Sequence, residues 1–119
     1  MPDTSKKIIL VDLWYSHCGP CIAQFDRLKQ FYSDFSGKGF EIVGISTDRK
    51  AERSVWRNTI THYQLPWQQL LDADQTEALK IAVDVFPTNF VLDGTGKILY
   101  KSVSLIQLGQ ILEKYCAAL

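Results

Sequence analysis

The sequence predicts a single α/β domain over residues 1–119, with a central mixed sheet flanked by helices. Three observations lead to this fold class. Apolar strand-like runs alternate with stretches of helical periodicity from one end of the chain to the other. Two such strands enclose a helix in the first half, and a glycine-containing hairpin follows in the second half. No repeat, low-complexity tract or Pro/Ser-rich linker divides the chain.

The first half is expected to form a strand, a helix and a second strand. Residues 8–14 (IILVDLW) are a nearly continuous apolar run, as expected of a parallel strand covered on both faces. From Cys21 onward, apolar residues recur every three or four positions, which predicts a helix ending near Gly37 and Gly39. Residues 40–46 (FEIVGIS) predict a second buried strand, parallel to the first through a right-handed crossover.

The middle of the chain predicts two further helices. Residues 51–63 place apolar side chains on one helical face, and Pro66 ends this pattern because it lacks a backbone donor. Asp74 and Glu77 have the spacing of a capping box, which predicts a short helix to about Ala82. These helices form an extra helical connection between the two halves of the sheet.

The second half ends in a hairpin and a helix. Residues 88–92 and 97–103 flank the turn sequence DGTG, whose glycines tolerate positive φ, so an antiparallel hairpin is expected. A Ser-x-x-Gln capping box at Ser104 then begins a last helix that extends to about Cys116. The predicted order is βαβ, two helices, and ββα.

The composition and net charge do not indicate a strongly charged binding partner. Thirteen basic and thirteen acidic residues give a formal net charge of zero, so no basic field for nucleic acid or an anionic membrane is expected. The apolar run that starts at Ile8 meets Asp12 and is too short for a signal-peptide core or a membrane span. Because this run begins so close to the N-terminus, we expect a domain excised from a longer precursor, with any membrane tether outside this segment.

Cys18 and Cys21 stand two residues apart in the sequence HCGPC, between the first strand and the first helix. The unpaired amides and positive dipole end of a helix stabilise a thiolate, so Cys18 is the predicted nucleophile. Cys21 lies one turn further along and is expected to be less accessible, which suits a resolving thiol. Pro20 fits the first helical turn, and Gly19 leaves room for a substrate backbone.

The other interpretations of this pair are half of a zinc site or a static disulfide. Zinc would need two further ligands, and the only distant candidates are His62 and Cys116, whose spacing gives no reason to converge. Cys116 is expected to face the core. One isolated CxxC near a βαβ pattern favours redox chemistry. We therefore expect no metal and no cofactor other than a redox-active Cys18–Cys21 disulfide.

The segment ILVDLWYSHCGPC resembles the active-site strand and motif of the thioredoxin family. The long connection after FEIVGIS, the segment IAVDVFPTNFVLDGTGKI and the closing helix resemble the TlpA and ResA branch of that family. The resemblance covers nearly all of the chain from Ile8. It implies a thioredoxin fold.

The resemblance also implies roles for residues around the cysteines. Asp12 matches the buried aspartate that accepts a proton from the inner cysteine, the alternative being an aspartate on an exposed face. Pro87 matches a proline in cis conformation that packs against the CxxC and exposes the backbone of Phe86 to an extended substrate, the alternative being a trans turn proline. The implied substrate-contacting residues are Trp14, Gly19, Pro20, Phe86 and Pro87.

Three positions depart from the pattern of the relatives. His17 stands where thioredoxins usually have Trp, Gln24 where TlpA-like proteins often have Glu, and Asp26 in the place of a helix-kinking proline. Asp26 therefore predicts a straighter first helix. His17 is either a surface bystander or a positive charge that stabilises the Cys18 thiolate and eases reduction of the disulfide. The sequence does not decide between these two interpretations.

The resemblance implies a bacterial thiol-disulfide oxidoreductase that acts on protein disulfides, as a reductant supplied by an upstream electron donor. It implies a periplasmic or membrane-anchored location, with a cytoplasmic role as the alternative. Two other functions are the alternatives. A thiol peroxidase would have Thr three residues before its reactive cysteine, where this chain has Tyr15. A non-enzymatic interaction module of a larger protein would have no need of an intact CxxC.

Overall fold

A computed structural model describes residues 8–116 of the chain. The expectation of a longer precursor rests on the first seven residues, which lie outside the described residues. The described strands are β1 (Ile8–Trp14), β2 (Phe40–Ser46), β3 (Gln68–Leu71), β4 (Thr88–Asp93) and β5 (Ile98–Lys101). The described α-helices are α1 (Gly19–Ala23), α2 (Phe25–Phe35), α3 (Arg53–Tyr63), α4 (Thr76–Lys80) and α5 (Leu105–Tyr115).

The strands form one mixed sheet in the order β3-β2-β1-β4-β5. β1 pairs in parallel with β2, and β2 in parallel with β3, whereas β4 is antiparallel to both β1 and β5. This arrangement confirms the predicted α/β class and mixed sheet. β1 lies at the centre, so the loop that follows it emerges at the carboxyl edge of the most enclosed strand.

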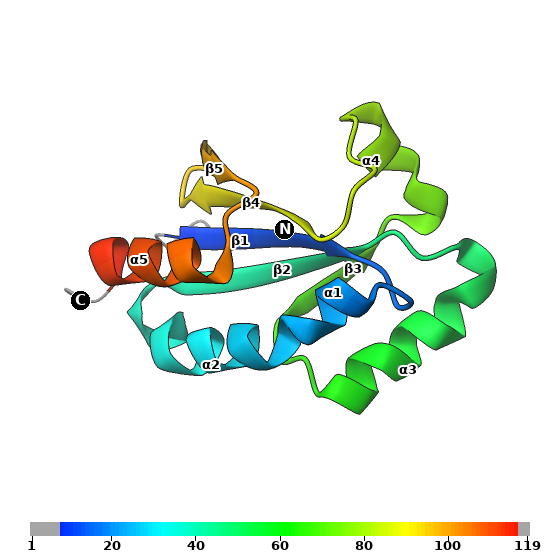
Figure 1. The fold of residues 1–119 in the computed structure, drawn as a ribbon, viewed down its shortest axis with the longest axis horizontal. Coiled ribbons are helices and arrows are strands. Elements are labelled where there is room, and N and C mark those ends of the chain that lie inside the picture. The colour runs from blue at the N-terminus through cyan, green and yellow to red at the C-terminus, as the bar shows by residue number, and fades with distance from the viewer. Residues whose placement is uncertain (1–7, 117–119) are drawn as a thin grey trace.

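The main core lies on one face of the sheet. Side chains of α1, α2, α3 and α5 pack there against alternate residues of the central strands. In Figure 1, α1, α2 and α3 lie below the sheet and α4 lies above it. The opposite face carries a smaller cluster around Leu13, Ala78 and Val83, to which the short α4 contributes. None of the described helices is both long enough and apolar enough to cross a membrane.

The first helix is interrupted, contrary to the prediction of a straighter one. α1 ends at Ala23 and α2 begins at Phe25, although Asp26 replaces the proline of many relatives. The interruption lies at Gln24, whose N–H bonds to the carbonyl of Cys21 at 3.2 Å in a 3₁₀-type turn. A break in this helix therefore does not require proline.

The middle of the chain differs from the prediction in two ways. β3 was missed, because two of its four residues are glutamines and the segment lacks an apolar alternation. The capping box at Asp74 was wrong. Asp72 instead caps α4, because its carboxylate accepts hydrogen bonds from the N–H groups of Glu77 and Ala78 at 2.9 and 2.8 Å. Asp74 accepts a hydrogen bond from the N–H of Lys50.

The predictions for the second half are confirmed. β4 and β5 form the antiparallel hairpin across the DGTG turn, where Gly96 has a φ of 92°. The capping box at Ser104 is present in both directions, with the Gln107 side chain bonding back to the Ser104 N–H. Cys116 is completely buried, as expected.

Candidate active site

The cysteine pair lies at the start of α1, directly after β1. Cys18 and Cys21 form a disulfide, with their Cα atoms 5.3 Å apart. Cys18 is the N-cap of α1, and its Sγ accepts a hydrogen bond from the backbone N–H of Cys21 at 3.2 Å. Pro20 occupies the first turn, where its missing N–H leaves no bond unmade. This geometry directs a free helical amide at the sulfur of the predicted nucleophile.

Both cysteine residues have almost no contact with solvent. Cys18 is 2% exposed and Cys21 is 1% exposed, so both are enclosed in the oxidised pair. Both residues pack into the main core, and the lower accessibility expected of the Cys21 thiol stays a prediction for the reduced pair. What distinguishes the cysteines is the hydrogen bond to Cys18 Sγ, which would stabilise charge on that sulfur.

The positions between the cysteines are open. Gly19 and Pro20 are exposed, and a Cβ built on Gly19 meets no atom within 4 Å. A substrate backbone can therefore approach Gly19 closely. Two shallow depressions border this region. One, of about 410 Å³, is lined in part by Ser16 and Ile22, and the other, of about 240 Å³, by Tyr15 and Phe86 among others.

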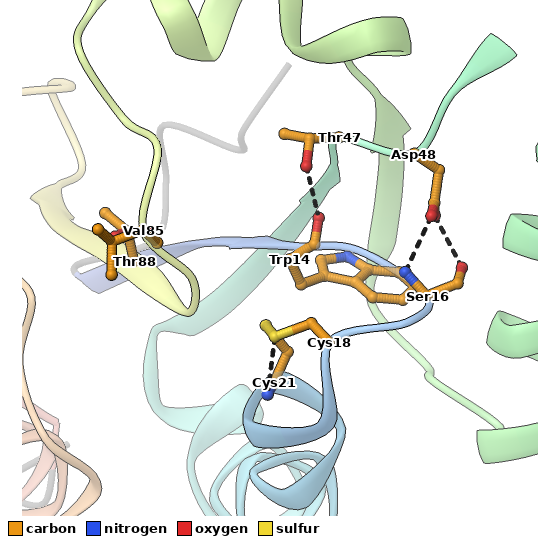
Figure 2. The surroundings of a disulfide bond; sticks show 8 residues. All are labelled: Trp14, Ser16, Cys18, Cys21, Thr47, Asp48, Val85 and Thr88. Carbon is orange, nitrogen blue, oxygen red and sulfur yellow. Dashed lines mark hydrogen bonds between the residues drawn. A yellow bond between two sulfur atoms is a disulfide. The ribbon is translucent and has the colours of Figure 1, made fainter.

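A buried carboxylate holds the loop that precedes the cysteines, and the sequence analysis did not identify it. Asp48 is 4% exposed and follows β2. Its Oδ1 accepts a hydrogen bond from the Ser16 N–H at 2.9 Å, and its Oδ2 accepts from the hydroxyls of Ser16 and Ser46 at 2.7 and 2.6 Å. Figure 2 shows Ser16 and Asp48 facing one another across the carboxyl ends of β1 and β2. That position, just past a parallel strand, was the signal available in the sequence.

A second contact joins the same two loops. The N–H of Thr47 donates to the carbonyl of Trp14 at 2.9 Å. The Thr47 hydroxyl donates to the same carbonyl at 3.4 Å (Figure 2). The end of β1 and the loop after β2 are therefore tied by both backbone and side-chain bonds. This fixes the point from which the chain turns into α1.

Asp12 lies within β1 and is 3% exposed, so the alternative of an exposed aspartate is excluded. Burial raises its pKa from 3.8 to about 7, because removing the carboxylate from water disfavours the charged form. Side chains alternate across a strand, so Asp12 shares a face with Leu10 and Trp14, the face that packs against Cys18 and Cys21. A carboxyl group near neutrality on this face can take up and release a proton.

Trp14 has no exposed surface. Trp14 thus presents no surface to a substrate in this structure, and the predicted substrate contact is corrected to a role in the core. Its ring packs edge-on against Phe25 with centroids 5.2 Å apart, and its Nε1 donates to Oε1 of Gln69 at 3.3 Å. Trp14 therefore fixes the end of β1 against the start of α2, directly after the helix that carries the cysteines.

The Phe86–Pro87 peptide bond is cis. Phe86 packs edge-on against Tyr15, in the loop before the cysteines, with ring centroids 5.4 Å apart. Val85 and Thr88, which flank this bond, lie in the surroundings of the disulfide (Figure 2). The segment before β4 therefore lies beside the cysteine loop. Direct contact between Pro87 and the cysteine pair stays a prediction.

His17 projects to the surface and pairs with a carboxylate. Its side chain is 67% exposed, and its Nε2 lies 2.8 Å from Oε2 of Glu52. Arg49 also bonds to Glu52, and these two partners lower the pKa of the Glu52 carboxyl. Any positive charge on His17 thus lies beside a negative one. No group of three or more His, Cys, Asp or Glu side chains within residues 8–116 could hold a metal ion.

Comparison with known proteins relates the chain to a family of redox proteins. Residues 1–101 match the AhpC/TSA family. The chain is 25% identical over 103 residues to the thiol-disulfide oxidoreductase ResA of Bacillus cereus, covering 87% of this chain and 58% of that protein. It is 30% identical over 97 residues to the thiol:disulfide interchange protein DsbE of Tatumella citrea, covering 80% of this chain and 49% of that protein. The chain thus spans about half of the length of these relatives.

Solved structures give the fold. The thioredoxin domain of a thiol-disulfide oxidoreductase from Bacteroides vulgatus superposes with a TM-score of 0.83 at 31% identity, covering 96% of this chain and 82% of that chain. A thiol:disulfide interchange protein from Bacteroides sp. gives a TM-score of 0.82 at 31% identity, covering 97% of this chain and 76% of that chain. The chain has the thioredoxin fold, as the resemblance implied.

Proposed function

Because the chain belongs to the AhpC/TSA family and to the ResA-like branch of the thioredoxin-like proteins, we propose that it is a thiol-disulfide oxidoreductase that reduces protein disulfides through Cys18 and Cys21. The observation that carries this proposal is the disulfide at the start of α1, with a helical N–H bonded to Cys18 Sγ. That bond favours a thiolate at Cys18 once the pair is reduced.

The first step is attack on the substrate. The Cys18 thiolate attacks one sulfur of a substrate disulfide, so that a bond from Cys18 to that sulfur forms and the substrate S–S bond breaks. The other substrate sulfur leaves as a thiolate. The approach is over Gly19, where the surface is open.

The second step releases the product. Cys21 gives its proton to the Asp12 carboxylate and attacks Cys18 Sγ, so that the Cys18–Cys21 bond forms and the mixed disulfide breaks. The second substrate sulfur leaves as a thiolate, and two electrons have passed to the substrate. A carboxyl group with a pKa of about 7 suits this transfer, since it is partly ionised at neutral pH. An upstream dithiol donor then reduces the disulfide.

We propose reduction rather than oxidation as the physiological direction. The sequence between the cysteines is Gly-Pro, as in thioredoxin, whose potential is about −270 mV, against about −120 mV for the oxidant DsbA. We also propose that the protein works outside the cytoplasm, tethered or as one domain of a longer chain. This rests on the resemblance to periplasmic and membrane-anchored reductants. A full-length gene product with neither an export nor an anchoring segment would overturn it.

The test of the activity is reduction of insulin disulfides with dithiothreitol as electron donor, measured beside consumption of hydrogen peroxide. We expect the parent to reduce insulin and Cys18→Ser to have lost this activity. We expect the parent to consume hydrogen peroxide no faster than Cys18→Ser does. Peroxide turnover without insulin reduction would make the protein a thiol peroxidase. A pair that no mild reductant opens would make it an interaction module.

A further inference from the structure

Asp12 shares a row with two residues from the neighbouring strands. In the register of the sheet Asp12 lies opposite Gly44 of β2, and Gly44 lies opposite Gln69 of β3. Residues paired across parallel strands point to the same face, so all three belong to the face that carries the cysteine helix. Gly44, between the two polar residues, has no side chain to separate them.

The side chain of Gln69 fills the space above Gly44. A Cβ built on Gly44 would lie 2.9 Å from both Cδ and Nε2 of Gln69, closer than real Cβ contacts. Gln69 therefore extends from the edge strand β3 across β2 towards β1. The hydrogen bond from Trp14 Nε1 to Gln69 Oε1, at 3.3 Å, shows that it reaches β1.

That bond also fixes how the amide is turned. An indole N–H is only a donor, so the carbonyl oxygen of Gln69 must face Trp14 and the NH₂ group must point elsewhere. Nε2 of Gln69 is buried and has no hydrogen-bond partner among the residues that the structure describes. A buried donor without a partner costs free energy, and the carboxyl group across Gly44 is an acceptor.

The amide of Asn89, on the other side of Asp12, is already occupied. Asn89 lies opposite Asp12 on β4, but its Nδ2 donates to the carbonyl of Val103 and its Oδ1 accepts from the N–H of Val103, both at 2.9 Å. Of the two amide side chains in this row, Gln69 is the one whose NH₂ group makes no hydrogen bond to any of the described residues.

We propose that Gln69 is a positioning residue for proton transfer, and that its Nε2 supplies, through one water molecule, the hydrogen bond that stabilises the ionised carboxylate of Asp12. The inference rests on the proposed role of Asp12 as proton acceptor. A hydrogen bond to the charged form favours ionisation, so Gln69 keeps Asp12 able to accept the proton of Cys21 near neutral pH.

Few titratable groups face Asp12. The titratable residues buried in the core on this face are Cys18 and Cys21 at the start of α1, and Cys116, which follows α5. Partly buried tyrosines pack at the edge of the same core: Tyr15, Tyr32, Tyr63 and Tyr115. Burial alone raises the pKa of Asp12, without a contribution from a charged neighbour. In the oxidised protein the first two cysteines do not titrate, so the Asp12 titration can be followed there without interference from the pair.

The experiment is an NMR titration of the Asp12 side-chain carboxyl carbon in the oxidised protein. Gln69→Leu removes the donor and keeps most of the volume, and it should raise the pKa of Asp12 by about one pH unit. Gly44→Ala keeps the Gln69 residue, but the added methyl group should displace the Gln69 amide. It should therefore also raise the pKa of Asp12. Gln68→Leu, at the exposed neighbouring position of β3, is the matched control and should leave the titration unchanged.

An Asp12 titration in Gln69→Leu that equals that of the parent would overturn the inference, as would a downward shift. If Gln69→Leu does not fold, Gly44→Ala decides in the same way. Insulin reduction by the parent is measured separately. If the parent does not reduce insulin but Gln69→Leu shifts the Asp12 titration, the proposed function is rejected and the water-mediated hydrogen bond from Gln69 to Asp12 is kept. If the parent reduces insulin but the titration is unchanged, the proposed function is kept and the role of Gln69 is rejected.

Discussion

The Asp48 carboxylate accepts two hydrogen bonds from Ser16, one from its backbone N–H at 2.9 Å and one from its hydroxyl at 2.7 Å. Ser16 stands two residues before Cys18. The loop that leads into the cysteine helix is thus fixed from the neighbouring strand, through a carboxylate that has almost no contact with solvent. Its removal would leave several buried donors without partners.

We therefore expect Asp48→Ala to lower the free energy of unfolding of the oxidised protein by about 2–4 kcal/mol, because the Ser16 N–H and the hydroxyls of Ser16 and Ser46 lose their acceptor. Asp48→Asn should cost less, since an amide oxygen can still accept from the Ser16 N–H. Urea denaturation measures both. Asp34→Ala, at an exposed position of α2, is the control and should change stability by less than about 0.5 kcal/mol.

The two cysteines should behave differently when each is replaced. Cys21→Ser should accumulate a mixed disulfide between Cys18 and a substrate, because no resolving thiol remains. Cys18→Ser should trap nothing, since the amide that stabilises a thiolate bonds to the sulfur at position 18. Non-reducing electrophoresis followed by mass spectrometry detects the adduct. Trapping through Cys21 in the Cys18→Ser variant would reverse the two assignments.

Asp12 should make the oxidised protein less stable as the pH rises. Its pKa is about 7 when folded and 3.8 in the reference state, so between these values the folded protein binds more protons than the unfolded chain. The preference of the folded protein for protonated Asp12 stabilises it fully below about pH 4. This stabilisation falls as the pH rises and is lost above about pH 7. At 1.36 kcal/mol per unit this amounts to about 4 kcal/mol as an upper value.

Asp12→Asn removes this dependence. We expect the variant to exceed the parent in stability by about 2–4 kcal/mol at pH 8 and by much less at pH 4, and to resolve mixed disulfides more slowly. Urea denaturation at the two pH values, with stopped-flow kinetics for resolution, provides the measurement. A difference in stability that is equal at both pH values would mean that Asp12 does not titrate in this range.

His17 and Glu52 should move the redox potential in opposite directions. A positive charge near Cys18 favours the thiolate and raises the potential, so His17→Trp should lower it at pH 6, by less than about 20 mV because Glu52 offsets the charge. Glu52→Gln should raise it. Glutathione equilibration at pH 6 and pH 8 brackets the range in which histidines change charge. A parent potential equal to or below that of His17→Trp at pH 6 would leave His17 as a bystander.

The sequence predicted the elements that have a strong local pattern. β1 and β2 match the predicted residues 8–14 and 40–46, because both are continuous apolar runs in the centre of a sheet. The last helix begins where the capping box places it. β3 was missed because an edge strand is specified by its partner β2 more than by its own residues.

Of the candidate site, the sequence likewise predicted the features that depend on neighbouring residues. The cysteine pair and the burial of Asp12 follow from adjacent residues and from the pattern of one strand. The contacts of Asp48 with Ser16 and of Gln69 with Trp14 could not be predicted, because each joins residues more than thirty positions apart and exists only in the folded sheet. The pairing of His17 with Glu52 is of the same kind.

The central position of β1 also sets the order in which the site can be assembled. The unit that carries the cysteines, from β1 through α1 and α2 to β2, closes within the first half of the chain, because its strand pairing joins residues of that half alone. The other edge of β1 pairs with β4, which comes from the second half and brings Phe86 beside Tyr15. During synthesis the cysteines would therefore be positioned first. The segment around Phe86, which lies beside the cysteine loop, would be added when the C-terminal hairpin pairs with β1.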